Sequence, residues 1–291
     1  LACTRTLTMT LAGDARAHPA EAASFADAGA TFHRRLPIAM DHPLLVLVVT
    51  FAVLWLSGWA GTSRFQRLRT QVAELRDDFN VVQGATLTLL GLVIGFTFSM
   101  AVGRYDQRKN LEEEEANAIG TAYVRADLLP AADAARVRPL LRSYLDLRIV
   151  HYTTRDAQEI ATIDARTAKL QSELWAAVRD SAVAAPTPIT ALAVASINDV
   201  LNSQGYAQAA WWNRIPIAAW VMMMAIAICS TILVGVGAKG GRTKGGLLVI
   251  LPLVLAIAFF LIADIDSPRW GVIRVQPQNL LSLAASLRAN P

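Results

Sequence analysis

The sequence predicts an all-α membrane protein: four transmembrane helices with a helical extramembrane insert between helices 2 and 3. Of its 291 residues, 54% are hydrophobic and only 17% are charged, whereas soluble domains average about 25% charged residues. The apolar residues are concentrated in four stretches, each long enough to cross a bilayer as a helix of roughly 20 residues. A long segment with helical periodicity, 104–214, separates the second stretch from the third.

Each of the four apolar stretches is expected to be one transmembrane helix, because backbone amides in lipid must bond within their own segment. The stretches cover residues 44–61, 81–103, 215–238 and 246–265. Tryptophans lie next to the first, third and fourth stretches, as is usual at membrane interfaces. Pro216 should lie in the first turn of the third helix, and Pro252 should bend the fourth.

Residues 1–39 differ from the rest, since they are rich in Ala, Asp, Arg and Thr and have no apolar core. We expect a disordered tail or an over-called start codon, because such a segment buries little apolar surface. Met40 stands just before the first span, so the first membrane portion is taken as 40–103. A lipoprotein signal at Cys3 is rejected, because no apolar segment precedes that cysteine.

The insert, 104–214, is expected to be helical throughout. The first of its helices continues directly out of the second span and ends at Pro130. Three more apolar stripes with spacings of three and four follow, with a break at Pro186 and Pro188. Each helix has one apolar face, so the insert should form a bundle or pack on neighbouring subunits. The third and fourth spans then occupy 215–267, and 268–291 is expected to be a C-terminal tail.

No pattern in the sequence points to catalysis or to a cofactor. Cys3 and Cys229 form no convincing disulfide or metal site, and the four histidines lack the spacing of metal ligands. His42 and His151 are expected at the interface or on the surface. No nucleophile with a neighbouring base is present. We therefore expect no enzyme activity, cofactor or metal, and the net charge of +4 gives no case for nucleic-acid binding.

The second span carries a face of small residues at spacings of three and four. Its members are Gly84, Thr88, Gly91, Gly95, Ser99 and Gly103. One interpretation is close packing of helices in lipid, where small residues let backbones approach. The other is a pore lining, in which small side chains and hydroxyls leave room for an ion. The pattern alone favours packing, because small-residue faces are common in membrane helices.

Two groups of acidic residues are also open to two interpretations. The run Glu112 to Glu115 is expected to be a solvated helix face, and a cation site is disfavoured because Ca²⁺ requires six to eight oxygens. Asp264 and Asp266 end the fourth span. They are either an interfacial helix end or part of an ion path or subunit contact, because ionisable groups at membrane helices tend to be functional.

Two segments of the chain resemble bestrophins. LLGLVIGFTFSMAVGRYDQRKNLEEEEANAIGTAY is similar to the region where the bestrophin pore helix leaves the membrane, with LLG, a Gly-Phe step and Tyr-Asp followed by arginine. ADIDSPRWGVIRVQPQNLL is similar to the segment after the last membrane helix. From Met40 onward the chain looks closer still to the uncharacterised bestrophin-like family of bacteria and plants, whose marks are EEANAIGTAYVRADLLP and the IAD-D-P ending.

The resemblance implies a homo-oligomeric anion channel, most simply a pentamer, whose pore is lined by the second helix. The pore-lining candidates are Thr88, Gly91, Gly95 and Ser99. Bestrophins narrow their pore with bulky apolar residues, but alignment on Tyr-Asp puts Gly91, Gly95 and Ser99 at those positions. The gate is then absent or moved to Phe96 and Met100. The acidic segment that binds calcium in animal bestrophins is also absent.

Charge at the end of the second helix suggests how anions could be attracted. Arg104 and Arg108 lie one turn apart there and would raise the local anion concentration by their field.

The alternative function is a non-conducting structural or interaction protein on the same scaffold. The absence of bulky apolar residues at the bestrophin constriction positions favours this alternative.

The expected location is the bacterial inner membrane, crossed several times. Seven basic residues in the short loops 62–80 and 239–245 favour a cytoplasmic position for those loops. The resemblance to bestrophins instead favours a cytoplasmic insert, and we adopt this second orientation as the expectation.

Overall fold

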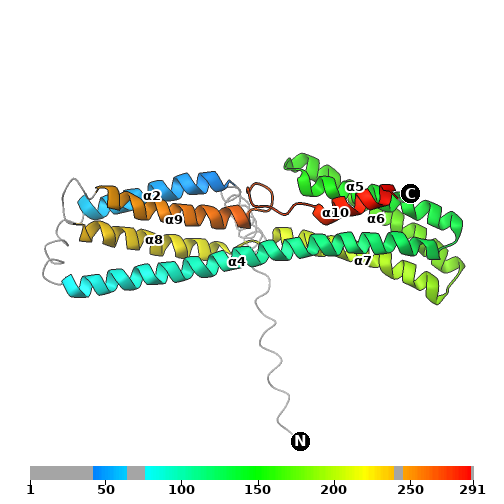
Figure 1. Ribbon diagram of the computed structural model, residues 1–291, viewed down its shortest axis with the longest axis horizontal. Coiled ribbons are helices and arrows are strands. Elements are labelled where there is room, and N and C mark those ends of the chain that lie inside the picture. The colour runs from blue at the N-terminus through cyan, green and yellow to red at the C-terminus, as the bar shows by residue number, and fades with distance from the viewer. Residues whose placement is uncertain (1–41, 64–75, 239–244, 290–291) are drawn as a thin grey trace, which may run out of the picture. The chain divides into compact units, whose positions relative to one another are not determined.

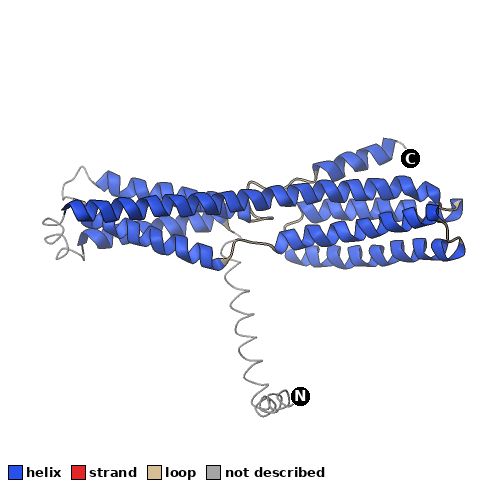
Figure 2. Ribbon diagram, turned by 90° about the horizontal axis from the view of Figure 1, so that it is seen from below, coloured by secondary structure: helices blue, strands red, loops and turns tan. Residues whose placement is uncertain are grey.

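One helix of 50 residues, α4 (Arg76–Arg125), forms the second apolar stretch and continues without a break into the insert (Figure 1). The computed structural model describes residues 42–63, 76–238 and 245–289. The other described elements are α2 (Pro43–Ser63), the 3₁₀ turn η1 (Ala126–Leu128), α5 (Ala131–Thr153), α6 (Ala157–Ala184), α7 (Pro188–Trp212), α8 (Ile217–Gly237), α9 (Gly245–Asp266) and α10 (Gln278–Ala289). These residues contain no strand (Figure 2), so the predicted all-α class is confirmed.

Four of the described helical stretches are long and apolar enough to cross a membrane, as predicted. They include α2, α4, α8 and α9. The expected tail at 1–39 lies outside the described residues, and so do most of the two basic loops used to judge orientation. Residues 41–291 form one compact unit, and all the contacts below are within it.

The helices begin and end where the local sequence provides caps or breaks. The Asp156 carboxylate accepts from the backbone nitrogens of Gln158 and Glu159 and so caps α6. Thr187 and Thr190 form a reciprocal capping box at the start of α7, with Pro188 in its first turn. Pro216 directly precedes α8, one residue earlier than expected.

In the membrane bundle, α2 packs against α8 and α9, and α4 packs against the same two helices. The closest approach joins α2 to α8 at two glycines. A Cβ on Gly61 would lie 2.5 Å from the carbonyl oxygen of Ile232, and one on Gly235 would lie 3.1 Å from the Cα of Gly61. Small residues therefore let α2 and α8 approach closely. The sequence suggested packing of this kind for α4.

The insert is a bundle formed by the outer half of α4 with α5, α6 and α7 (Figure 1). Its core includes Leu141, Tyr144, Leu174, Val178 and Ile197, which are fully or almost fully buried. A fifth helix, α10, packs on α4 and α5 and adds Leu280 and Ala284 to the same core. The expectation that 268–291 is a tail is therefore incomplete, because this segment supplies part of the insert core.

Candidate functional site

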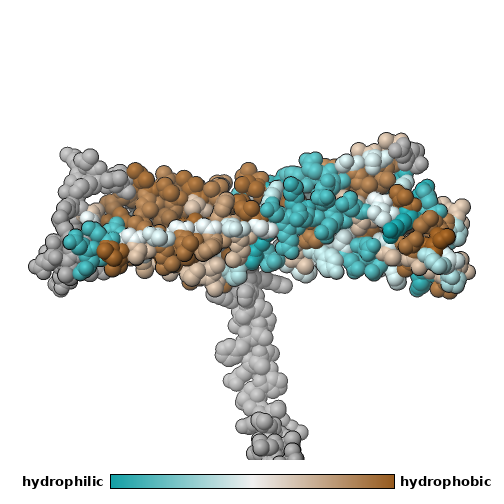
Figure 3. Space-filling view, turned by 60° about the horizontal axis from the view of Figure 1, so that its bottom comes forward, coloured by the Kyte–Doolittle hydropathy of each residue, from teal (hydrophilic) through white to brown (hydrophobic). Residues whose placement is uncertain are grey.

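The small-residue face of α4 is exposed along the membrane portion of the helix. Thr88, Gly91, Gly95 and Ser99 are all exposed. No described atom outside the local helix backbone lies within 4 Å of a Cβ built on Gly84, Gly91, Gly95 or Gly103. Figure 3 shows a pale band of intermediate hydropathy, as Gly, Thr and Ser would give, running through the brown apolar surface. The described part of the chain therefore does not pack closely on this face.

The opposite side of α4 packs inward. Leu90, Thr97 and Ala101 are buried, and at 100° per residue they lie roughly half a turn away from the small residues. The gate candidates Phe96 and Met100 are 66% and 42% exposed, and at 100° per residue they point to one side of the small-residue face. The structure thus places the four pore-lining candidates together on one free surface, with the two gate candidates beside it.

The two arginines proposed to attract anions do not lie on that surface. Arg108 is buried and donates to the carbonyl oxygens of Ile265 at 2.6 Å and Asp266 at 3.4 Å. It thereby satisfies the C-terminal carbonyls of α9. Arg104 is half-buried, and its Nη2 lies 3.6 Å from the Met100 sulfur. A role for Arg108 at an open pore exit does not agree with its burial on the opposite side.

Glu112 and Glu115 are also buried, so the expectation of a solvated face is wrong for these two residues. Glu112 accepts from the backbone nitrogens of Asn279 and Leu280, each at 3.0 Å, and from Asn279 Nδ2 at 2.7 Å. A carboxylate at the N-terminus of α10 is favoured by its free amides and its dipole. Glu113 and Glu114 are exposed, as expected.

Glu115 forms an ion pair with Arg148 of α5 inside the insert. Both side chains are fully buried, and Nη2 of Arg148 lies 3.4 Å from the second carboxylate oxygen. Tyr152 donates its hydroxyl to the same oxygen at 3.2 Å. Burial lowers the pKa of Arg148, but the Glu115 carboxylate together with Tyr144 and Tyr152 more than offsets this, so the pKa is raised overall. The Arg148 guanidinium therefore stays charged, and its contact with Glu115 links α4 to α5.

The carboxylates of the two aspartates at the end of α9 accept hydrogen bonds from backbone amides. Asp264 accepts from the nitrogens of Val272 at 2.7 Å and Ile273 at 2.8 Å. Asp266 accepts from the nitrogen of Ile215 at 3.2 Å and pairs with Arg214 at 3.4 Å. Both are buried. Within the chain they hold the loop after α9 and the connection before α8, and a role between subunits remains a prediction.

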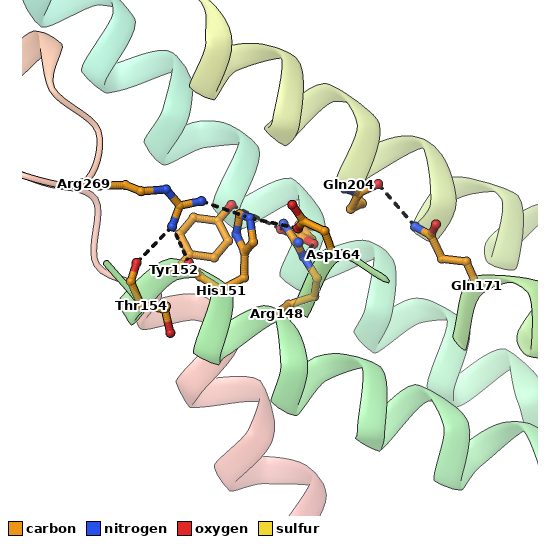
Figure 4. A network of polar contacts seen from close by, with 9 residues as sticks. Arg148, His151, Tyr152, Thr154, Asp164, Gln171, Gln204 and Arg269 are labelled. Atoms are coloured by element: carbon orange, nitrogen blue, oxygen red, sulfur yellow. Dashed lines mark hydrogen bonds and ion pairs between the residues drawn. The ribbon is translucent and has the colours of Figure 1, made fainter. Parts of the chain in front are cut away.

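A second polar network joins the loop after α9 to the insert (Figure 4). Arg269 donates to the carbonyl oxygens of His151 at 2.9 Å and Thr154 at 3.0 Å, at the end of α5. Its guanidinium also lies over the Trp211 ring, 4.3 Å from the centroid. His151 is fully buried, so the expectation of a surface or interfacial histidine is wrong for this residue.

The electrostatics of the network keep His151 neutral. Burial, together with the positive charges of Arg148 and Arg269, lowers its pKa to about 3. Burial also lowers the pKa of Arg269 to about 10, against the opposing effect of Asp164. Asp164 lies 3.4 Å from Nε2 of His151, but that nitrogen faces the Arg269 guanidinium at 3.1 Å. Arg269 is therefore charged at neutral pH and His151 is not.

The sequence contains a signal for part of this network. Arg148 and Tyr152 follow Tyr144 and Leu145 at spacings of three, four, seven and eight, so they share the buried stripe of α5. A charge at a core position of an amphipathic helix needs a buried partner. No comparable signal identified Arg269, which lies outside any helix. Among the described residues, no group of His, Cys, Asp or Glu could hold a metal ion.

These features define a helical membrane protein with four candidate spans, an extramembrane bundle and an exposed small-residue face on its longest helix. The model of the Bestrophin-like domain matches residues 47–280, and the chain belongs to this family. A search of the curated proteins finds no match.

Solved structures share the fold. A crystal structure of a variant of a bacterial bestrophin homologue from Klebsiella pneumoniae is similar, with a TM-score of 0.58 and 12% sequence identity over 84% of this chain and 98% of that one. Another structure of that homologue, obtained by Zn-SAD phasing, has a TM-score of 0.56 and 13% identity over 82% of this chain and 98% of the other. At such low identity the similarity shows the fold alone.

Proposed function

We propose that this chain forms a homo-oligomeric ion channel whose pore is lined by α4. The observation that carries the proposal is the free face formed by Thr88, Gly91, Gly95 and Ser99. Among the described residues of a single chain, this face of a membrane helix has no packing partner. A row of small and hydroxyl-bearing residues suits a water-filled axis better than lipid, because it offers little apolar area to acyl chains.

The proposed location is the bacterial inner membrane, crossed four times, with the insert on the cytoplasmic side. The proposed assembly is a pentamer, by resemblance to bestrophins. Exposed apolar residues of the insert support contacts between copies, since Val183, Ile189 and Leu192 are each about half exposed or more. Labelling of Lys169→Cys, an exposed site on α6, by an impermeant reagent in oriented vesicles tests the sidedness.

Family resemblance makes small anions the proposed ions. The charges that continue the free face of α4 outside the membrane are of both signs, because Asp106 and Glu113 are acidic and Lys109 is basic, while Arg108 is turned away from it. Carboxylates along a pore favour cations. The sign of the reversal potential across a salt gradient therefore decides the ion.

The test is flux through purified protein in liposomes, measured together with the native mass of each sample. Ser99→Trp should abolish flux and leave the oligomer intact, because the bulky ring would fill the axis. Val48→Trp is the control, since Val48 is 65% exposed on α2 and away from α4; it should leave flux unchanged. If Ser99→Trp instead dissociates the oligomer, the small-residue face is a packing surface between copies.

A non-conducting scaffold is the second candidate function. It is favoured by the small residues at the positions where bestrophins carry a bulky constriction. Wild-type oligomers that pass neither chloride, nitrate, sodium nor potassium at any tested pH would support the scaffold and exclude the channel.

A further inference from the structure

We propose that residues 267–275, here called the interfacial loop, bind the headgroup layer of the bilayer through Trp270, Val272 and Ile273. The loop directly follows α9, one of the candidate spans. The proposal does not depend on conduction, so the loop can bind lipid in a channel or in a non-conducting scaffold.

The interfacial loop is held in one conformation by the end of α9. The carboxylate of Asp264 accepts from two consecutive backbone nitrogens, those of Val272 and Ile273. The nitrogen of Trp270 donates to the Ser267 hydroxyl at 3.3 Å. A Cβ on Gly271 would lie 3.1 Å from the carbonyl carbon of Asp264, so only glycine fits there. The hydrogen bonds of the buried Asp264 carboxylate therefore stabilise this conformation of the interfacial loop.

The inner side of the loop is fixed to the insert. Arg269 caps the end of α5 and stacks on Trp211 of α7, and Val275 is buried in the insert core. These two anchors lie on either side of the exposed residues. The direction in which the loop projects is therefore set by the protein and does not need lipid to define it.

The outer side of the loop is apolar and unusually exposed. Val272 is 84%, Trp270 is 43% and Ile273 is 40% exposed. Single exposed apolar residues are common, but three within four positions of a loop held in one conformation mark an interaction surface. Leaving this apolar surface in contact with water is unfavourable.

The position of the patch favours lipid as the partner. The ring of Trp270 lies 5.3 Å from that of His42, which immediately precedes α2. The first turn of α2 exposes Leu44 and Leu45, so the patch lies beside the apolar surface of a candidate span at the level where that span begins. Tryptophan prefers this interfacial depth, where its ring is buried and its N–H is solvated.

The test measures the contact of the loop with lipid directly. Cys3 and Cys229 are first replaced by Ser, and Val272→Cys is labelled with an environment-sensitive nitrobenzoxadiazole fluorophore in phosphatidylcholine–phosphatidylglycerol liposomes. Phospholipids with a nitroxide at the headgroup or along the acyl chain serve as quenchers. Lys169→Cys, in the insert, is the matched exposed control, and gel filtration checks that both variants keep the wild-type assembly.

We expect the label at residue 272 to be quenched several-fold more strongly than the label at 169, most efficiently by the headgroup and upper-chain nitroxides. Equal quenching at both sites would overturn the proposal, since the loop would then face water. A blue-shifted but unquenched label, with disulfide cross-linking of Val272→Cys between copies, would also overturn it and assign the patch to a subunit contact. The quenching results do not depend on whether the protein conducts ions. The lipid-contact proposal and the channel proposal can therefore be contradicted separately.

Discussion

Arg269 donates to the carbonyl oxygen of His151 at 2.9 Å, and its other terminal nitrogen lies 3.1 Å from Nε2 of the same histidine. Arginine has no acceptor, so Nε2 must accept and the proton of the neutral imidazole lies on Nδ1. The loop after α9 therefore contacts the end of α5 through a bond that requires an uncharged histidine. Protonation of His151 would place its positive charge beside those of Arg148 and Arg269 in a buried site.

This contact predicts a dependence of stability on pH. In the unfolded chain His151 titrates near pH 6.5, and in the folded protein its pKa is about 3. Between these values the unfolded state binds more protons, so the free energy of unfolding falls as pH decreases, by up to about 1.4 kcal/mol per pH unit. His151→Gln should therefore make the melting temperature in mild detergent less sensitive to pH between about pH 6.5 and pH 4.

His42→Gln is the control for that experiment, because His42 is exposed. Its melting temperature should follow the wild-type curve. An unchanged slope for His151→Gln would mean that other groups cause the acid sensitivity and that His151 is not held neutral by burial.

The buried pair of Glu115 and Arg148 predicts strong coupling between two substitutions. Arg148→Met leaves a carboxylate without its cation in the insert core and should destabilise the protein by about 3–5 kcal/mol. Combining it with Glu115→Gln should recover a large part of that loss, because the remaining amide carries no charge. Chemical unfolding followed by circular dichroism measures both values.

Arg179→Met provides the exposed comparison, since Arg179 pairs with Asp180 on the surface of α6. Its effect should stay below about 1 kcal/mol. Additive effects of the Glu115 and Arg148 substitutions would argue against a direct interaction between the two residues.

Two glycines in different environments give a third prediction. Gly235→Ala should separate α8 from α2 and lower thermal stability, because its Cβ would overlap the backbone of α2. Gly95→Ala should leave the fold of each chain intact, because no described atom outside its own helix backbone would meet the new methyl group. Melting temperature and native mass on both variants separate folding from assembly, and equal destabilisation by the two substitutions would contradict the structure.

The sequence was sufficient for the fold class because lipid imposes a strong constraint: each apolar stretch had to be a helix. It also located the small-residue face of α4, since helical spacing decides which residues share a face. It could not tell which helices approach closely, because small pairs such as Gly58 and Gly61 or Thr231 and Gly235 occur in several spans and do not identify the partner helix.

The acidic residues show a second limit of the sequence. Glu112 to Glu115 looked alike, yet two are buried and two are exposed. The difference depends on α10 and Arg148, which meet α4 only in the folded chain. The same holds for Arg108, whose direction is set by the end of α9. Partners distant in sequence therefore decided the roles that local patterns left open.

Glu112 gives the last prediction, because its carboxylate caps the start of α10. Glu112→Ala removes a carboxylate that accepts three hydrogen bonds from Asn279 and Leu280. The buried amides would lose their partners, and the variant should be less stable by about 2 kcal/mol. Release of α10 would also uncover Leu280, which is fully buried in the insert core. Limited proteolysis in detergent should then cleave the chain between 276 and 289 faster than in the wild type.

Glu113→Ala is the matched control, since Glu113 is the next residue on α4 and is exposed. It should change stability by less than about 0.5 kcal/mol and leave the cleavage rate unaltered. Glu112→Gln separates charge from hydrogen bonding, because its amide oxygen can still accept from the backbone of α10 while the charge that favours the helix dipole is lost. Its cleavage rate should fall between those of the wild type and Glu112→Ala. If Glu112→Ala and Glu113→Ala behave alike, α10 is held by its apolar contacts and the buried carboxylate does not stabilise it.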